Sequence, residues 1–101
     1  MSKYVLTEEA DEDLVELWEY IAQDDIEAAD RWDGKLRDAM SSLARSPGIG
    51  HKRPDLTDLP ILFWPVGAYL ILYRIRNRRV EVLAVVHAAR DIPTFLRTRA
   101  Q

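Results

Sequence analysis

A chain of 101 residues, 48% hydrophobic and 31% charged with a net charge of −3, is long enough for one domain with its own core. The absence of cysteine excludes disulfides and thiolate metal sites, and two histidines are too few for a metal centre. No apolar run approaches the ~20 residues that cross a bilayer, and acidic residues interrupt the N-terminal segment where a signal peptide would stay apolar. We therefore expect a single cytoplasmic domain over residues 1–101, without metal, cofactor or membrane partner.

The first half of the chain predicts a short strand followed by two helices. Residues 3–7 alternate loosely between polar and apolar, as a half-buried strand does. Thr7 can cap a first helix, on which one face is apolar (Ala10, Leu14, Leu17, Trp18 and Ile21) and the opposite side is polar (Glu9, Asp13, Glu16 and Tyr20). Asp24 and Asp25 then open a second helix, which Pro47-Gly48 ends. Its inner stripe comprises Ala29, Trp32, Leu36, Ala39 or Met40, and Leu43. So short a connection predicts an antiparallel helical hairpin.

The second half predicts three antiparallel strands over residues 61–66, 69–75 and 80–86, because their connections have hairpin length. Pro65 cannot donate a hydrogen bond to a neighbouring strand, which places the first of the three at a sheet edge or a bulge. Pro93 starts a short last helix over residues 94–99. The order β-α-α-β-β-β-α predicts an α+β fold, with the helical hairpin packed on one face of a small, mostly antiparallel sheet.

These strands are apolar on both faces, whereas an antiparallel sheet covered on one face alternates between apolar and polar residues. The helical hairpin can cover one face, but a last helix of about two turns cannot cover all of the other. We expect a partner segment to cover the rest, either as a helix in a groove or as a strand added to the sheet edge. Without that partner, the chain is expected to aggregate or self-associate.

Charge divides the chain into two unlike halves. Residues 1–44 hold four Lys/Arg and thirteen Asp/Glu, for a net charge of −9, whereas residues 45–101 hold ten and four, for a net charge of +6. The division indicates an acidic or polyanionic partner for the basic half, or acidic helices that neutralise a basic sheet within one fold. Lys52 and Arg53 in a loop and Arg74 in the central strand are expected to converge beside His87. The arginines of the turn at residues 76–79 lie where charge usually serves solubility.

The last strand runs into His87, Arg90 and Asp91, a cluster that permits two interpretations. In the catalytic one, His87 acts as acid or base, Asp91 orients it and Arg90 holds a phosphate. In the structural one, Asp91 pairs with an arginine and caps the final helix, while His87 donates to a backbone carbonyl.

The order of elements and three segments together resemble the RelE/ParE toxin superfamily over essentially the whole chain. The segments are Pro47–Leu56, Tyr69–Arg74 and above all His87-Ala88-Ala89-Arg90-Asp91. The resemblance implies the toxin of a bacterial type II toxin–antitoxin pair, neutralised by a small antitoxin, ParD-like or other, encoded beside it. For this toxin we expect target contacts at Lys52, Arg53, Arg74, His87, Arg90 and Asp91, and antitoxin contacts at Leu62, Trp64, Leu70 and Leu72.

The superfamily has two branches with different targets. RelE-like members cut messenger RNA on the ribosome, using Lys, Arg and a Tyr near the C-terminus, whereas ParE-like members inhibit DNA gyrase and have no known catalytic group. This chain has Leu70 where the ribonucleases tend to carry Arg, and Phe95-Leu96 where they carry Tyr. These departures favour the ParE-like branch, with gyrase as the target. A ribosome-dependent endoribonuclease and a toxin fold that has lost its toxicity are the alternatives.

Overall fold

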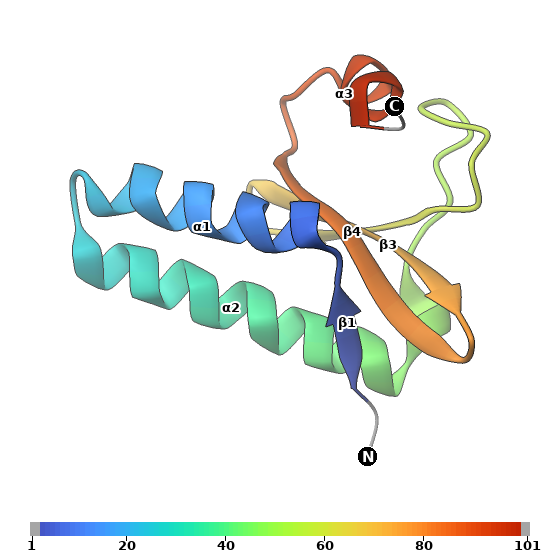
Figure 1. Ribbon diagram of the computed structural model, residues 1–101, viewed down its shortest axis with the longest axis horizontal. Helices are drawn as coiled ribbons and strands as arrows, with labels where there is room; N and C mark the ends of the chain where they lie inside the picture. The colour runs from blue at the N-terminus through green and yellow to red at the C-terminus, as the bar shows by residue number, and fades with distance from the viewer. Residues whose placement is uncertain (1–2, 100–101) are drawn as a thin grey trace.

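The computed structural model describes residues 3–99 and confirms the predicted order of elements. Its helices and strands are β1 (Tyr4–Leu6), α1 (Glu8–Ala22), α2 (Ile26–Arg45), β2 (Leu62–Val66), β3 (Tyr69–Arg76), β4 (Arg79–His87) and α3 (Ile92–Arg99), with a 3-10 turn at Pro47–Ile49. The antiparallel helical hairpin of α1 and α2 lies beside the sheet, and α3 lies away from that hairpin, near the end of β4 (Figure 1).

The four strands form one sheet in the order β1-β4-β3-β2, with β1 parallel to β4 and the other pairs antiparallel. Pro65 lies on the edge strand β2, as predicted. The outer side of β2 is partly occupied, because the backbone N–H of His51 donates to the Phe63 oxygen (2.9 Å) and its carbonyl accepts from the Phe63 N–H (2.8 Å). Between them, His51 and Pro65 leave little of this edge free to pair with another strand.

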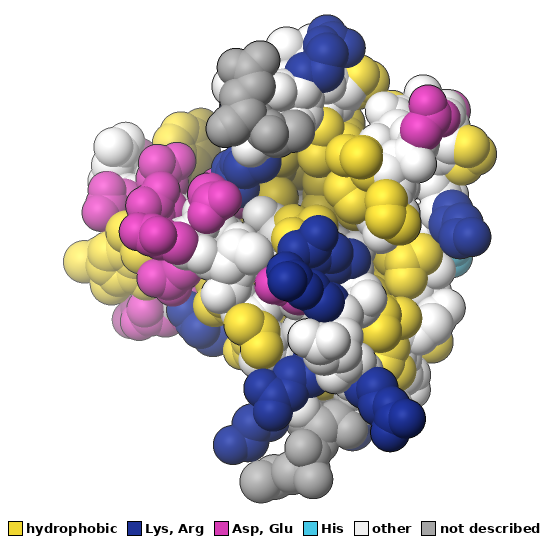
Figure 2. Space-filling view, turned by 45° about the vertical axis from the view of Figure 1, so that its right-hand side comes forward, with side chains coloured by type: hydrophobic (Ala, Val, Ile, Leu, Met, Phe, Trp, Pro, Cys, Tyr) yellow, Lys and Arg dark blue, Asp and Glu magenta, His cyan; other side chains and the backbone are white. Residues whose placement is uncertain are grey.

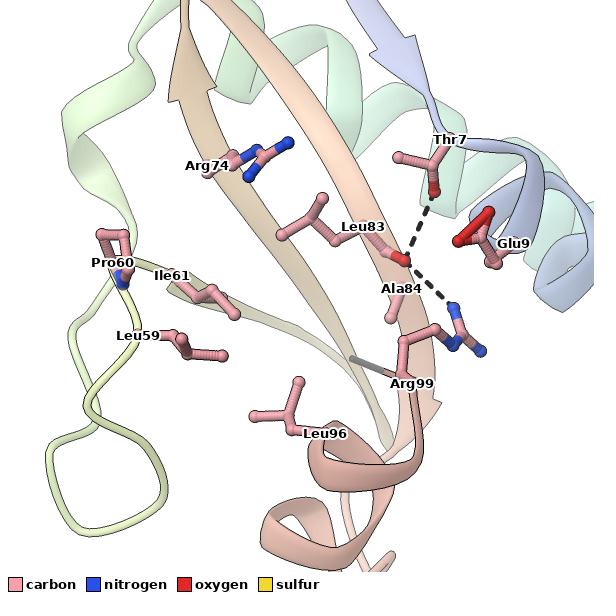
Figure 3. A pocket seen from close by; sticks show the side chains of 10 residues that line it. All are labelled: Thr7, Glu9, Leu59, Pro60, Ile61, Arg74, Leu83, Ala84, Leu96 and Arg99. Atoms are coloured by element: carbon pink, nitrogen blue, oxygen red, sulfur yellow. Dashed lines mark hydrogen bonds between the residues drawn. The ribbon is translucent and has the colours of Figure 1, made fainter. Parts of the chain in front are cut away.

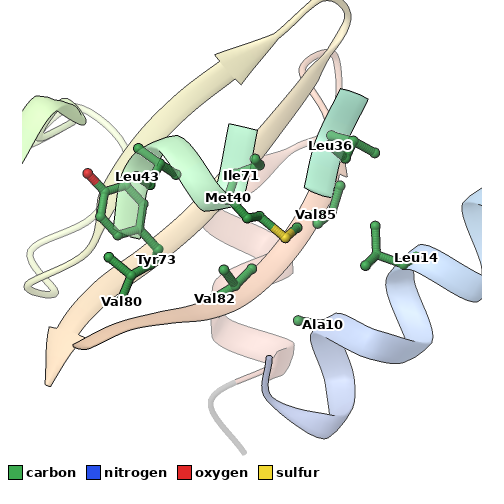
Figure 4. Close-up of a cluster of buried hydrophobic side chains, with 10 residues drawn as sticks. All are labelled: Ala10, Leu14, Leu36, Met40, Leu43, Ile71, Tyr73, Val80, Val82 and Val85. Carbon is green, nitrogen blue, oxygen red and sulfur yellow. The ribbon is translucent and has the colours of Figure 1, made fainter. Parts of the chain in front are cut away.

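The face under the helical hairpin carries the first of two core clusters. Leu14, Leu36 and Met40 come from the helices and meet Tyr73 and other strand side chains (Figure 4). The cluster comprises Ala10, Leu14, Leu36, Met40, Leu43, Ile71, Tyr73, Val80, Val82 and Val85. The predicted inner stripes therefore supply this core.

Trp18 and Trp32 correct the predicted helix stripes, because both are only half-buried. The indole of Trp18 donates through Nε1 to Asp30 (2.8 Å). Trp32 meets the ring of Tyr69 edge-on, with ring centroids 5.1 Å apart. The two tryptophans thus join neighbouring elements at the border of the core, where a large ring can keep part of its surface in water.

Tyr73 ties the turn after α2 to the sheet. Its hydroxyl donates to the Pro47 carbonyl (2.6 Å) and accepts from the Gly50 N–H (2.9 Å). Burial raises the pKa of this hydroxyl above its ordinary value of 10.0, while the Gly50 hydrogen bond acts in the opposite direction. Because the folded state holds the phenolic proton more tightly than the unfolded state, this stabilisation is present below pH 10 and is lost as the pH rises above it.

Tyr73→Phe is expected to lower the free energy of unfolding by about 1–3 kcal/mol at neutral pH, since two backbone groups lose their partner. The gap to the wild type should narrow as the pH rises above 10. Urea unfolding across this pH range measures both effects, with Tyr20→Phe as the control because Tyr20 is 71% exposed. Equal stability of the two variants at neutral pH would argue against a structural role for the Tyr73 hydroxyl.

The opposite face carries the second core cluster. Ile92, Phe95 and Leu96 of α3 pack on this face of the sheet together with chain that precedes β2. The cluster comprises Ile61, Phe63, Leu70, Leu72, Ala84, Val86, Ile92, Phe95 and Leu96. The prediction that a short last helix covers only part of this face is confirmed, because a groove remains beside α3.

Candidate functional site

β4 contains one extra residue at Leu83. Tyr73 pairs with Val82 and Leu72 pairs with Ala84, so Leu83 has no partner on β3. Such a bulge interrupts the alternation of side chains along a strand. Leu83 and Ala84 consequently both pack with the second core cluster, although they are neighbours in the chain.

These two side chains form the floor of a groove of about 290 Å³ on the second face (Figure 3). The apolar walls come from the loop before β2 and from α3. Polar side chains of the sheet, of α1 and of α3 lie at the rim. The complete lining is Thr7, Glu9, Leu59, Pro60, Ile61, Arg74, Leu83, Ala84, Leu96 and Arg99. Apolar side chains gather on this side of the molecule with Lys and Arg around them (Figure 2). A concave apolar surface with a few polar groups at its rim can hold an apolar segment of another chain.

Asp13 connects the three elements that meet at one end of this groove. Its carboxylate accepts from the Val85 N–H (3.0 Å) and from Arg99, at Nη2–Oδ1 2.9 Å and Nη1–Oδ2 3.3 Å. Arg99 also donates through Nη1 to the carbonyl of the bulged residue Leu83 (3.1 Å). The predicted place of Asp13 on the polar side of α1 is wrong, because its side chain is 12% exposed and joins α1 to β4 and α3. Its position three residues after Ala10, beside the apolar stripe, is the signal that could have shown this.

Three of the predicted target contacts gather around the loop before β2. Arg74 lines the groove and pairs with Glu81, its cross-strand neighbour on β4. Lys52 and Arg53 line an adjoining hollow of about 540 Å³, which shares loop residues 59–61 with the groove.

His87 and Arg90 lie at the other end of β4, contrary to the prediction that the basic residues converge beside His87. Tyr69 pairs with His87 and Arg74 pairs with Glu81. Five residues of β3 therefore separate Arg74 from the level of His87, which is roughly 17 Å at about 3.4 Å per residue. The register of the β3–β4 hairpin thus divides the predicted cluster into two groups.

Asp91 has the structural role that was one of its two interpretations. Its carboxylate accepts from the Thr94 N–H (3.2 Å) and the Thr94 hydroxyl (2.9 Å), and these hydrogen bonds hold the pKa of Asp91 below its usual 3.8. The cap makes α3 begin at Ile92, two residues earlier than predicted. Nδ1 of His87 accepts from the Ala89 N–H (3.0 Å), so the predicted donation to a backbone carbonyl is wrong for this nitrogen.

The four residues predicted to meet the antitoxin do not share a surface. Leu70 and Leu72 lie in the second core cluster, 9% and 0% exposed, whereas Leu62 and Trp64 pack against the first cluster on the opposite face. The sheet register causes this division, since Leu62 pairs with Tyr73 rather than with Leu72. The accessible apolar side chains of the groove come instead from a loop, a bulge and the last helix. The alternation of apolar and polar residues along a strand does not predict such positions.

Comparison with known proteins decides the family. The model of the family described as "ParE toxin of type II toxin-antitoxin system, parDE" matches residues 4–92. The chain belongs to this ParE toxin family. A protein of Sinorhizobium fredii (strain NBRC 101917 / NGR234) named "Putative toxin Y4kP" is 36% identical over 92 residues, covering 82% of this chain and 84% of that protein.

A solved structure described as "Chromosomal ParDE TA system from P. aeruginosa" has the same fold as this ParE-family toxin. The TM-score is 0.71 at 16% sequence identity, over 86% of this chain and 96% of that chain. The match confirms the predicted RelE/ParE-like α+β fold.

The two positions that depart from the ribonuclease pattern are core positions in this ParE-family toxin. Leu70 is 9% exposed and Phe95 is 6% exposed. Two guanidinium groups lie over the ring of Phe95, Arg90 at 4.6 Å and Arg99 at 4.5 Å from the ring centroid. Both residues therefore serve packing on the second face.

Two further findings concern residues 3–99. Within that range no helix is long and apolar enough to span a membrane, and no three His, Asp or Glu side chains are grouped so that they could hold a metal ion.

Proposed function

We propose that this ParE-family toxin inhibits DNA gyrase by binding to it, and that an antitoxin encoded beside it neutralises the inhibition by occupying the groove. Family membership supports the toxin–antitoxin part of the proposal. The groove beside α3 offers the antitoxin an apolar docking surface with basic groups at its rim.

The dispersal of the polar groups is the observation that carries inhibition by binding rather than by catalysis. Cleavage of a phosphodiester needs an acid, a base and a phosphate ligand within reach of one phosphate. Arg90 lies at the same end of β4 as His87, but Arg74 lies roughly 17 Å away along β3, by the strand rise of about 3.4 Å per residue, and Lys52 and Arg53 line the hollow that adjoins the groove of Arg74. Asp91 is engaged with Thr94 at the start of α3 and does not contact His87 through any hydrogen bond of residues 3–99.

Purified toxin is expected to block supercoiling of relaxed plasmid by gyrase and to leave messenger RNA on programmed ribosomes intact. Both assays use the same preparation, so a preparation that is inactive in both would support the alternative of a fold without toxicity. Cleavage within codons at the ribosomal A site, lost in Arg90→Ala, would establish the endoribonuclease instead.

Arg90 is a better candidate target contact than Arg74. Arg74 is held by Glu81 at the rim of the groove, whereas Arg90 is exposed and forms no salt bridge with any residue of the range 3–99. The guanidinium rests on the ring of Phe95, which leaves its N–H groups directed to solvent or to a partner.

Arg90→Glu is accordingly expected to reduce growth inhibition by the induced toxin at least tenfold, because a contact is replaced by a repulsive charge. Arg31→Glu on α2 is the matched control, since it makes the same charge change at another exposed position. Colony counts at equal toxin abundance measure the effect. Full toxicity of soluble Arg90→Glu protein would remove Arg90 from the target surface.

Of the two modes of antitoxin binding expected from the sequence, a helix in the groove is favoured over an added strand. The β2 edge is occupied by His51 and interrupted by Pro65. At the opposite edge of the sheet, β1 is only three residues long, so the second half of β4 has no neighbouring strand on this side within the range 3–99. There the Val85 N–H donates to Asp13 and the Leu83 carbonyl accepts from Arg99. Long free edges that would accept a strand are therefore scarce in the described sheet.

A further inference from the structure

The turn between β3 and β4 has an unusual sequence for its backbone conformation. Asn77 and Arg78 form a two-residue loop with positive φ values of 52° and 62°. This geometry is that of a type I′ turn, in which glycine is preferred at the second position because it has no Cβ. Arg78 occupies that position here. We call Arg76, Arg78 and Arg79 the hairpin tip.

A second unfavourable feature lies next to the turn. Arg76 is directly opposite Arg79 in the last pair of the β-hairpin, and like charges facing each other across two strands destabilise the pair. All three arginines of the hairpin tip are exposed, and no salt bridge among residues 3–99 includes any of them. The positive φ of Arg78 and the repulsion between Arg76 and Arg79 both destabilise the fold locally. Local destabilisation without a compensating contact is expected at sites that bind a partner.

The hairpin tip continues from the groove. A hollow of about 490 Å³ is lined by Val5, Arg76, Asn77, Arg79 and Glu81, and Glu81 is already paired with Arg74 at the groove rim. The turn lies at the opposite end of the two strands from α3 (Figure 1). A segment that runs along the groove and past Arg74 therefore next meets Arg76 and Arg79.

We propose that the hairpin tip binds an acidic segment of the antitoxin, adjacent to the apolar segment that fills the groove. The inference rests on the proposed neutralisation through the groove and adds the chemistry of the neighbouring antitoxin residues. Carboxylates of that segment would form salt bridges with the arginines of the hairpin tip. A carboxylate between Arg76 and Arg79 would also offset the repulsion between these two like charges.

Two observations favour an acidic peptide over the phosphate backbone of a nucleic acid. An exposed apolar side chain accompanies the hairpin tip, since Val5 is 39% exposed and lines the same hollow as Arg76 and Arg79, and a peptide can cover such surface whereas a phosphate backbone cannot. The helical hairpin of the same small molecule is strongly acidic, since residues 1–44 carry a net charge of −9, and this field repels an extended polyanion.

The double variant Arg78→Gly/Arg79→Thr separates this role from a structural one, because stability and binding should change in opposite directions. Glycine at position 78 adopts the positive φ without strain, and threonine at position 79 removes the repulsion between Arg79 and Arg76. These two changes should together raise Tm by about 4 °C or more. Affinity for the full-length product of the adjacent gene should fall ~10-fold at about 50 mM salt, and the difference should shrink at about 300 mM as charge is screened. Arg31→Ala/Arg45→Ala on α2 removes two exposed charges elsewhere and should leave affinity unchanged.

Calorimetric titration of the wild type, both double variants and the groove variant Leu59→Glu distinguishes the outcomes. Weaker, less salt-dependent binding by the more stable hairpin-tip variant supports the inference. Unchanged antitoxin affinity at both salt concentrations, with binding still lost in Leu59→Glu, overturns it while the proposed function stands. Unchanged antitoxin affinity with lost binding of a 30-base-pair DNA duplex assigns the hairpin tip to nucleic acid and also overturns it. A wild type that does not bind the antitoxin overturns both proposals.

Discussion

Asp13→Ala is expected to lower the free energy of unfolding by about 3 kcal/mol, the largest stability loss that we expect from a single polar residue of this toxin. The change removes the partner of Arg99, whose side chain is only 24% exposed, and leaves the guanidinium facing an apolar surface without its carboxylate. It also leaves the Val85 N–H of β4, which lies beyond the end of β1 and has no neighbouring strand there among residues 3–99, without its acceptor. Urea unfolding at neutral pH measures the loss.

Two comparisons test the reason for this loss. Glu16→Ala, on the same helix at an exposed position, should change stability by less than about 0.5 kcal/mol. Asp13→Ala combined with Arg99→Met should recover part of the loss, since the unpaired charge is then gone. An Asp13→Ala protein as stable as Glu16→Ala would show that the Asp13–Arg99 pair does not hold α3 against the sheet.

Leu59→Glu is expected to weaken antitoxin binding at least 100-fold, which corresponds to about 3 kcal/mol. Leu59 lines both the groove and the hollow beside it, and an antitoxin helix in the groove would bury the new carboxylate against apolar side chains without a partner. The toxin alone should remain folded, because Leu59 is 49% exposed.

Val15→Glu is the matched control for this substitution. Val15 is 50% exposed on α1, outside the groove, so the same new charge is introduced at equal exposure. Titration calorimetry of both variants against the antitoxin, with Tm checked for each, gives the comparison. Equal affinities would place the antitoxin on another surface of the toxin.

The element order could be predicted from the sequence because it depends on local patterns. The apolar stripes of the two helices, with Leu14 on α1 and with Leu36 and Met40 on α2, have helical spacing, and these residues are in the first core cluster. Gly67 marks the turn between β2 and β3. The edge position of β2 follows from the missing N–H of Pro65.

The candidate site could be predicted only in part, because it depends on register and on contacts between distant residues. The bulge at Leu83 leaves no mark in an apolar run, yet it places two neighbouring side chains in one groove. The distance between Arg74 and His87 follows from the β3–β4 pairing, which a cluster of basic residues in the sequence does not reveal. Asp13 and Arg99 are 86 residues apart, so their pairing has no local signal at all.

Gyrase supercoiling in the presence of toxin, with and without antitoxin, tests inhibition by binding and neutralisation through the groove most directly. The predicted result is that the wild-type toxin and Leu59→Glu both block supercoiling, and that the antitoxin restores it for the wild type and fails to restore it for Leu59→Glu. Val15→Glu should behave as the wild type does. Undiminished supercoiling with any amount of folded wild-type toxin, or equal rescue of wild type and Leu59→Glu by the antitoxin, would contradict this function and its site.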